Sequence, residues 1–135
     1  MAIDYKQIDT ISTPAAASLF DAADFPDPDY RFSDDKIAKM IANSSIIVAA
    51  MEDDRLVGLC LCLSNFISIC FLQAIAVSPD HKGHGIGKAL IDKSRDIAGG
   101  DGVTFVTVST PEAIGFYENI GLERCRNAFI AARKR

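Results

Sequence analysis

The chain has 135 residues, of which 49% are apolar, and this predicts a single domain over residues 1–135 with a well-filled core. Its formal net charge of −4 argues against a general nucleic-acid binder. Residues 1–5 include an acid and no apolar run, so we expect no secretory leader.

Three elements are predicted in the N-terminal third: a strand over 3–8, a helix over 14–23 and a second helix that begins after Ser33. Thr13 is expected to cap the first helix, and Ser33 the second. Asp34 and Asp35 then lie in the first turn of the second helix, where negative charge is favourable. Residues 25–32 between the helices form a proline-punctuated loop.

Six aspartates lie within residues 21–35, where Arg31 is the only basic residue; they are Asp21, Asp24, Asp27, Asp29, Asp34 and Asp35. Clustered carboxylates favour a cationic ligand through their local potential. The same pattern also fits a solvated loop followed by helix-start acids.

The central part predicts a hairpin with strands over 46–51 and 56–63, followed by a long strand over 66–77. The stretch 56–77 is apolar enough to raise the question of a membrane span. A turn at Ser64-Asn65 divides it into two pieces of strand length. We therefore expect two buried strands and no membrane span.

The C-terminal part predicts a helix over 87–98, a strand over 103–108, a helix between Thr110 and Gly121, and a last strand over 127–132. Thr110 is expected to cap the second of these helices, and Pro111 fits its first position. Gly99-Gly100 ends the first helix, and a basic tail follows the last strand. The whole pattern is that of a mixed α/β sheet.

The four cysteines, Cys60, Cys62, Cys70 and Cys125, show no metal-ligand spacing, so no metal is expected. Cys60 and Cys62 lie in an apolar strand pattern, where both side chains face the same side. Buried free thiols are the simpler interpretation, and they fit a reducing cytoplasm. A redox pair is the alternative.

Gly83, Gly85 and Gly87 lie within five positions at the junction of the 66–77 strand and the following helix. Glycines there permit unusual backbone angles and let a ligand approach the main chain. The helix start directs free amides and a positive dipole end at that ligand. This arrangement is typical of a phosphate or pyrophosphate site.

Two nucleotide-binding motifs fail on these residues, and an ordinary glycine-rich turn remains an alternative. A Walker A loop needs glycine where Lys82 stands and a hydroxyl where Ala89 stands. A GxGxxG fingerprint from Gly83 ends on Lys88. The run Lys82-Gly83-His84-Gly85-Ile86-Gly87 instead resembles the Q/R-x-x-G-x-G/A pyrophosphate loop of the GNAT N-acetyltransferase superfamily, with Lys82 in the Gln or Arg position.

Both flanks carry the same resemblance. Ile75-Ala76-Val77-Ser78-Pro79 is similar to the end of the fourth strand in that family. Residues 113–122, AIGFYENIGL, resemble its A-x-x-F-Y-x-x-x-G-F signature, with Leu122 in place of Phe. The resemblance implies the GNAT α/β fold: a mixed, mostly antiparallel central sheet flanked by helices.

The resemblance also implies acetyl-CoA as co-substrate. Its pyrophosphate would be held by the 82–88 loop, that is Lys82, Gly83, His84, Gly85, Ile86, Gly87 and Lys88. Its pantetheine arm would lie along Ile75, Ala76 and Val77, where a strand bulge near Ile75 frees an amide to polarise the thioester carbonyl. The positive residues around the loop, Lys82, His84, Lys88 and Lys93, agree with an anionic ligand.

By the same resemblance, Tyr117 is the acid that protonates the leaving sulfur; a packing aromatic beside Phe116 is the alternative. No general base can be named, since Thr104 and Thr107 are the only polar residues of their strand. A water chain, or a carboxylate of the 21–35 segment, remains open. Ser109 to Glu112 stand where many relatives place an asparagine that contacts the cofactor arm.

The implied reaction is acetyl transfer to a primary amine of a small molecule. In the family, the segment between the first two helices borders the acceptor site, so the acids of 21–35 suggest a cationic amine. A homodimer is the habit of that family. The alternatives are a non-catalytic acyl-CoA-binding regulator on the same fold and, more distantly, a nucleotide-binding module.

Overall fold

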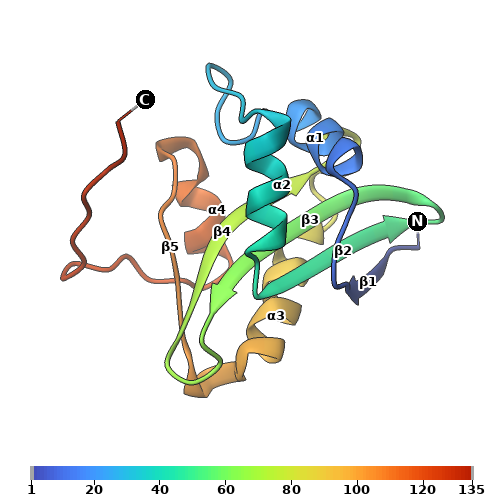
Figure 1. The fold of residues 1–135 in the computed structure, drawn as a ribbon. Coiled ribbons are helices and arrows are strands. Elements are labelled where there is room, and N and C mark those ends of the chain that lie inside the picture. Colours follow the sequence, from blue (N-terminus) through green and yellow to red (C-terminus); the bar gives the residue numbers. More distant parts are fainter. Residues whose placement is uncertain (1, 135) are drawn as a thin grey trace.

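The computed structural model describes residues 2–134. Figure 1 shows the elements in chain order: β1 (Asp4–Gln7), α1 (Thr13–Ala22), α2 (Asp34–Ala42), β2 (Ile46–Glu52), β3 (Arg55–Ser64), β4 (Ile69–Val77), the 3₁₀ turn η1 (Pro79–His81), α3 (Ile86–Ala98), η2 (Gly100–Gly102), β5 (Thr104–Thr107), η3 (Pro111–Ala113) and α4 (Ile114–Asn119).

The sheet has five strands in the order β1-β2-β3-β4-β5, so spatial order follows chain order. The first four strands pair antiparallel with their neighbours, and β5 alone pairs parallel, with β4. The parallel pair needs a crossover, which α3 supplies. This mixed, mostly antiparallel sheet confirms the predicted fold class.

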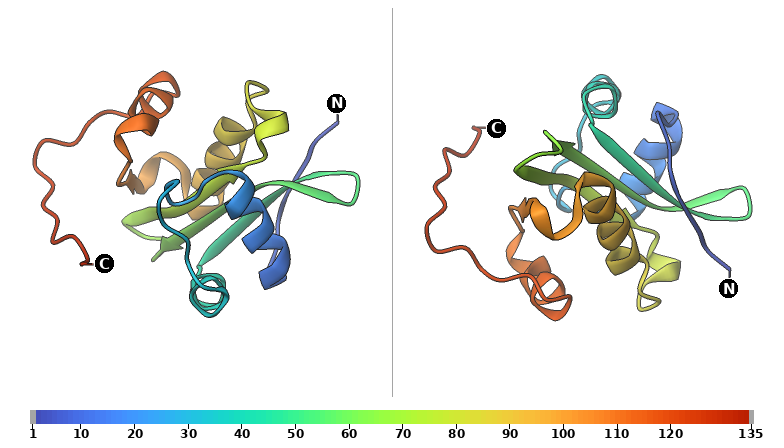
Figure 2. Two further views of the ribbon diagram at one scale, coloured as in Figure 1. Left: turned by 90° about the horizontal axis from the view of Figure 1, so that it is seen from above. Right: turned by 90° about the horizontal axis from the view of Figure 1, so that it is seen from below.

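Helices cover both faces of the sheet, with α1 and α2 on one face and α3 and α4 on the other (Figure 2). Successive strand residues face opposite sides, so β3 serves two cores. Leu59 and Leu61 pack with α1 and α2, whereas Cys60 and Cys62 pack with α3. The apolar stretch 56–77 is thus β3, a turn and β4, and no helix within residues 2–134 is long and apolar enough to cross a membrane.

The three cysteines of the α3-side core are free and buried, as the sequence predicted for Cys60 and Cys62. The Sγ atoms of Cys60 and Cys62 lie 3.9 Å apart, and the Ser94 hydroxyl donates to the Cys60 sulfur at 3.4 Å. Burial raises the pKa of Cys70 to about 12, so this thiol stays neutral. Cys125 is exposed.

The helix caps follow the sequence at Ser33 but not at Thr110 or Thr13. Thr110 precedes the 3₁₀ turn η3 and makes no side-chain cap hydrogen bond, and α4 begins only at Ile114. Ser33 caps α2 as predicted, since its Oγ accepts the Lys36 amide at 3.3 Å. Ser12, and not Thr13, caps α1: the Ser12 Oγ accepts the amide of Ala15 at 3.2 Å. Thr13 is already the first helical residue, so its backbone angles do not suit the cap.

The predicted strand over 66–77 begins three residues late, at Ile69. The Asn65 Oδ1 accepts the amides of Ile67, Ser68 and Ile69 at 2.9–3.1 Å and holds residues 65–68 in a turn. Phe66 takes a positive φ of 61° there. An asparagine that satisfies successive amides competes with the strand ladder, so the turn extends beyond Ser64-Asn65.

The predicted last strand over 127–132 is wrong. Residues 123–134 form no strand and are exposed, with Phe129 at 98% and Ile130 at 69% of full exposure. After Gly121 the chain runs away from β5 (Figures 1 and 2), so this β-prone sequence meets no strand edge with which to pair.

Candidate active site

Strands β4 and β5 pair only along the first half of β4. Their pairing covers Ile69–Leu72 against Thr104–Thr107, where β5 ends, while β4 continues to Val77. Residues 74–77 therefore pair with β3 on one side only, and the other edge of residues 73–77 has no β5 partner. Such an edge can hydrogen-bond an extended ligand as an added strand does.

The residues predicted to line the pantetheine arm all lie on this open edge. Ile75 and Val77 direct half-buried side chains to the α3 face, and Ala76 is buried on the α1 and α2 face. The predicted bulge is present, centred on Gln73: Leu61 pairs with Ala74 and Cys62 with Leu72, so Gln73 has no partner. Its position is two residues before Ile75.

The glycine loop follows directly. Gly83 and Gly85 have φ values of 84° and 76°, in the left-handed region that favours glycine. A Cβ added at either would meet nothing within 4 Å, so the space beside this backbone is open. Gly85 is the N-cap of α3 and provides no capping side chain, which leaves the amides of the first helical turn available. α3 begins at Ile86, one residue before the prediction.

At Gly87, the lack of space for a side chain favours glycine. A Cβ at this position would lie 2.9 Å from Cζ of Phe116, so any other residue would displace the Phe116 ring. Ile86 is buried in the α3-side core, which leaves only its backbone for a ligand. The Phe116 ring thus places α4 against the loop.

The charges around the loop are partly exposed and partly compensated. Lys82 and His84 are exposed, as the sequence pattern requires for an anion site. The Nζ of Lys88, in contrast, lies 2.6 Å from the Asp92 carboxylate one turn along α3. Lys88 is therefore a weaker source of positive potential than its position in the sequence suggests.

The hairpin turn between β2 and β3 anchors the entry to the loop, a feature that sequence reasoning missed. The Nε2 of His81 lies 3.0 Å from Oε1 of Glu52, and the His81 side chain is buried. Arg55 donates to the Ser78 hydroxyl and to Asp80, both at 3.4 Å. These contacts join residues more than twenty positions apart, so no local pattern could have revealed them.

Tyr117 lies on α4 and borders the same core cluster as Ile75 and Val77. Burial raises its pKa above the ordinary 10.0, while a hydrogen bond with Thr107 acts in the opposite direction. The Thr107 hydroxyl also donates to the Leu72 carbonyl at 3.1 Å. Leu72 and Thr107 form the last β4–β5 pair, so the Tyr117 phenol lies at the point where the two strands separate, which we call the fork.

The acidic segment borders the opposite face of β4. Phe25 and Phe32 pack against the core cluster that contains Ala74 and Ala76. The negative charge of the segment 21–35 is partly compensated, because Arg31 pairs with Asp21 at 2.9 Å and with Asp24 at 3.6 Å.

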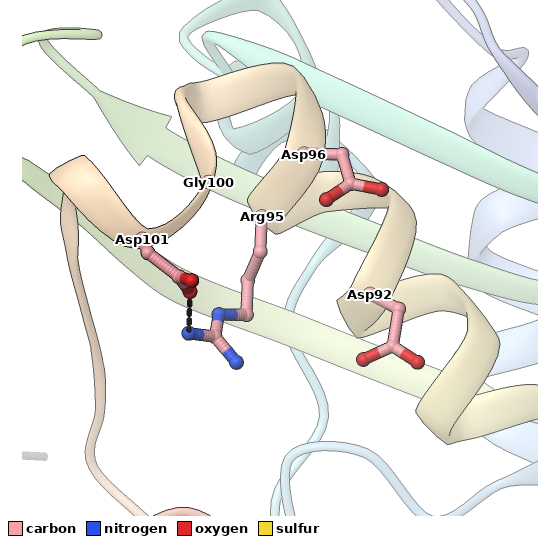
Figure 3. Close-up of a pocket in the computed structure, with 5 residues that line it drawn as sticks. All are labelled: Asp92, Arg95, Asp96, Gly100 and Asp101. Carbon is pink, nitrogen blue, oxygen red and sulfur yellow. Dashed lines mark ion pairs between the residues drawn. The ribbon is translucent and has the colours of Figure 1, made fainter.

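A separate hollow of about 290 Å³ lies at the other end of α3 (Figure 3). It is lined by Asp92, Arg95, Asp96, Gly100 and Asp101. The guanidinium of Arg95 reaches toward the Asp101 carboxylate at 3.8 Å. None of the predicted site residues lines this hollow, and its acids do not suit a pyrophosphate.

The sequence of this chain matches the model of the Acetyltransferase (GNAT) family over residues 10–122. The chain belongs to the GNAT acetyltransferase family. It is 28% identical over 101 residues to the peptidyl-lysine N-acetyltransferase YjaB of Escherichia coli K12. That match covers 74% of the chain and 65% of YjaB, so the chain spans just under two thirds of this curated relative.

Solved GNAT structures share the fold. A GNAT family acetyltransferase from Streptococcus pneumoniae TIGR4 superposes with a TM-score of 0.74 at 22% identity, over 98% of this chain and 100% of that one. The enzyme AAC(6')-Iy, in complex with the bisubstrate analog CoA-S-monomethyl-acetylneamine, gives 0.70 at 19% identity, over 100% and 99% of the two chains. At these identities the likeness establishes the fold alone.

Proposed function

We propose that residues 1–135 act as one acetyl-CoA-dependent N-acetyltransferase domain, which moves an acetyl group to a primary amine in a ternary complex. The observation that carries this proposal is the open edge of β4, with the glycine loop at its end and Tyr117 at its fork. Family membership and the CoA-analog complex of AAC(6')-Iy support acetyl-CoA as the donor.

The binding part of the proposal rests mainly on backbone groups. The amides from Gly83 to Lys88 hold the pyrophosphate, because the loop is open at Gly83 and Gly85 and the helix start is uncapped. The arm lies along residues 75–77, whose free edge can pair with its amide groups. The bulge at Gln73 leaves backbone polar groups out of the ladder close to the thioester position.

The chemical part assigns one proton transfer to the chain. The acceptor nitrogen attacks the thioester carbonyl, the C–S bond breaks, and Tyr117 donates its proton to the leaving sulfur. The phenol is protonated at neutral pH even with its ordinary pKa of 10.0, and burial raises the pKa of Tyr117 further. An alkyl ammonium has a pKa of about 10.4 and must lose a proton before attack. Water accepts this proton and the second one that the nitrogen loses when the amide forms, and the Tyr117 phenolate regains a proton from water.

The acceptor that we propose is cationic. The carboxylates of residues 21–35 lie on the segment that borders β4, which supports a positively charged amine. YjaB is named a peptidyl-lysine N-acetyltransferase, so lysine peptides join small amines as candidates. The buried free thiols suit a reducing compartment such as the cytoplasm.

One observation favours a second candidate, a non-catalytic acyl-CoA-binding regulator. On β5, the strand that reaches the fork, Thr104 and Thr107 are the only polar side chains, and neither is a base at neutral pH. A regulator of this kind would bind acetyl-CoA and acetylate no amine.

An amine panel separates the two candidates. Acetyl-CoA is supplied with polyamines, amino sugars and short lysine peptides, and the products are identified by mass. Acetylated product that depends on the chain establishes the transferase. Tight CoA binding by calorimetry with no acetylated product establishes the regulator, and the absence of CoA binding contradicts both.

A further inference from the structure

The segment after α4 reaches back to the loop between α1 and α2. The guanidinium of Arg133 lies 4.8 Å from the centre of the Phe32 ring and 5.4 Å from that of Tyr30. The two rings themselves meet edge to face, with centroids 5.2 Å apart and planes at 88°. Cations within about 6 Å of a ring centre are attracted by its negative face.

This segment arches outward beyond the β5 side of the sheet and passes from one face of the sheet to the other (Figure 2). It leaves α4, whose Tyr117 lies at the fork, and ends beside the layer formed by α1 and α2 (Figure 2). Phe32 packs there against the cluster that includes Ala74 and Ala76 of β4. Between these two points the segment is exposed, as Phe129 and Ile130 show. Arg133 thus links the two layers that flank the free edge of β4.

Charge favours this contact. The segment carries Arg124, Arg126, Arg133 and Lys134, and the loop carries the aspartates of residues 21–29. Two cations outside the segment also lie nearby. Arg31 pairs with Asp21 and Asp24, and the Nζ of Lys36 lies 3.3 Å from the Tyr30 hydroxyl. Even with these cations nearby, the guanidinium of Arg133 lies over the Tyr30 and Phe32 rings.

We propose that Tyr30 and Phe32 form a subsite for a second cationic group of the acceptor, and that Arg133 occupies this subsite as an internal competitor. This inference rests on the proposed function in assuming a cationic acceptor. It narrows the substrate class to amines that carry another positive group, such as a lysine next to an arginine in a peptide. It also makes the segment 123–134 a strap that such an acceptor displaces.

The occupied state has a spectroscopic signature that does not require turnover. In the full chain, the Hδ and Hε resonances of Arg133 should be shifted upfield by the ring currents of Tyr30 and Phe32. Addition of N-acetyl-Lys-Arg-amide should return them to random-coil values, at lower concentration than N-acetyl-Lys-Ala-amide. Random-coil shifts in the free protein, or equal potency of the two peptides, would overturn the proposal.

Kinetics test the competition directly. Arg133→Ala should lower the KM for N-acetyl-Lys-Arg-amide about two- to five-fold, as expected for a cation–π contact at an exposed site, and leave kcat unchanged. Arg126→Ala is the matched control, because it removes the same charge from the same segment without a contact to either ring. A KM for Arg133→Ala that equals that of the control, or exceeds that of the wild type, contradicts an internal competitor.

The subsite itself is tested in the Arg133→Ala background. Tyr30→Leu should raise the KM for N-acetyl-Lys-Arg-amide by a similar factor and leave that for N-acetyl-Lys-Ala-amide unchanged. Calorimetry with CoA confirms that each variant is folded. Equal effects on both peptides would exclude a second-cation subsite. If no amine is acetylated at all, the proposed function fails, while the resonances of Arg133 still decide this inference.

Discussion

Replacing Tyr117 with phenylalanine tests the proposed acid with the smallest structural change. The substitution keeps the ring that borders the α3-side core and its edge-to-face contact with Phe116, at 5.1 Å between centroids. It removes only the hydroxyl, whose pKa is raised by burial and partly lowered again by the nearby Thr107 side chain at the fork of β4 and β5. The substitution therefore separates the packing role of Tyr117 from its proposed role as a proton donor.

The two roles predict effects on different scales. Even loss of a full hydrogen bond would cost only about 0.5–1.5 kcal/mol of folding free energy, which corresponds to a fall in Tm of at most a few degrees. Loss of a general acid costs about 10²–10⁴-fold in rate. Allowing for partial replacement by water, we expect kcat to fall at least roughly tenfold, with CoA affinity nearly unchanged.

The pH dependence of folding stability gives a second test of the surroundings of Tyr117. The pKa of Tyr117 is raised by burial above its ordinary 10.0, so the folded state favours the neutral phenol. The resulting stabilisation is fully present below about pH 10 and is lost as pH rises through the folded pKa. The stability difference between wild type and Tyr117→Phe should therefore be constant near neutrality and shrink in alkali.

The assay is single-turnover acetyl transfer, so that chemistry and not product release is measured. Tyr5→Phe is the matched control, because Tyr5 lies on β1, at the opposite edge of the sheet from β5. A single-turnover rate in Tyr117→Phe that equals that of this control would refute the acid assignment. Loss of CoA binding or unfolding would instead support a packing role.

Four further predictions concern the loop, its anchor, the acceptor side and the thiols. Gly85→Val should weaken CoA binding at least roughly tenfold by calorimetry, since valine is strained at a φ of 76°; Gly102→Val, where a Cβ meets nothing within 4 Å, should not. Glu52→Gln removes the charge 3.0 Å from His81 and should weaken CoA binding a few-fold, with kcat nearly unchanged; a lower Tm with full affinity would make the pair purely structural. Changing Asp27 and Asp29 together to Asn should raise the KM for a cationic amine a few-fold, less so in high salt, and equal KM values would leave these acids as solvated surface. A thiol reagent should label only Cys125 in the folded chain and all four cysteines after denaturation, and early labelling of a second thiol would contradict the buried cluster.

The sequence predicted what depends on local chemistry. Ser33 caps its helix because a serine hydroxyl can reach an amide three residues on, and this can be recognised from the residues alone. The cap of α1 was misplaced by one position because Ser12 and Thr13 are both competent. The extended turn at Asn65 depends on a side chain that accepts three amides, an outcome that the residue type allows and does not require.

The failures lie where the outcome depends on distant partners. Residues 127–132 have the composition of a strand, but a strand also needs an edge beside it, and the chain after α4 does not meet one. The bulge was expected near Ile75, but its exact position at Gln73 depends on the register between β3 and β4, which no single segment determines. The contact of Glu52 with His81 likewise joins a hairpin turn to the loop across the fold.

The proposed site would depend on few side chains, in a fold shared by chains that have only 19–22% of their residues in common. On β4 the side chains of Ala74 and Ala76 serve one core, and those of Ile75 and Val77 border the other. The open edge between the two cores consists of backbone, and so do the amides of the loop at Gly83 and Gly85. Core positions accept many apolar residues of similar volume, whereas the backbone groups are common to all residues. In the proposed site, glycines at positive φ and the phenol at the fork are therefore the main side-chain requirements, and these are among the residues from which the site was predicted.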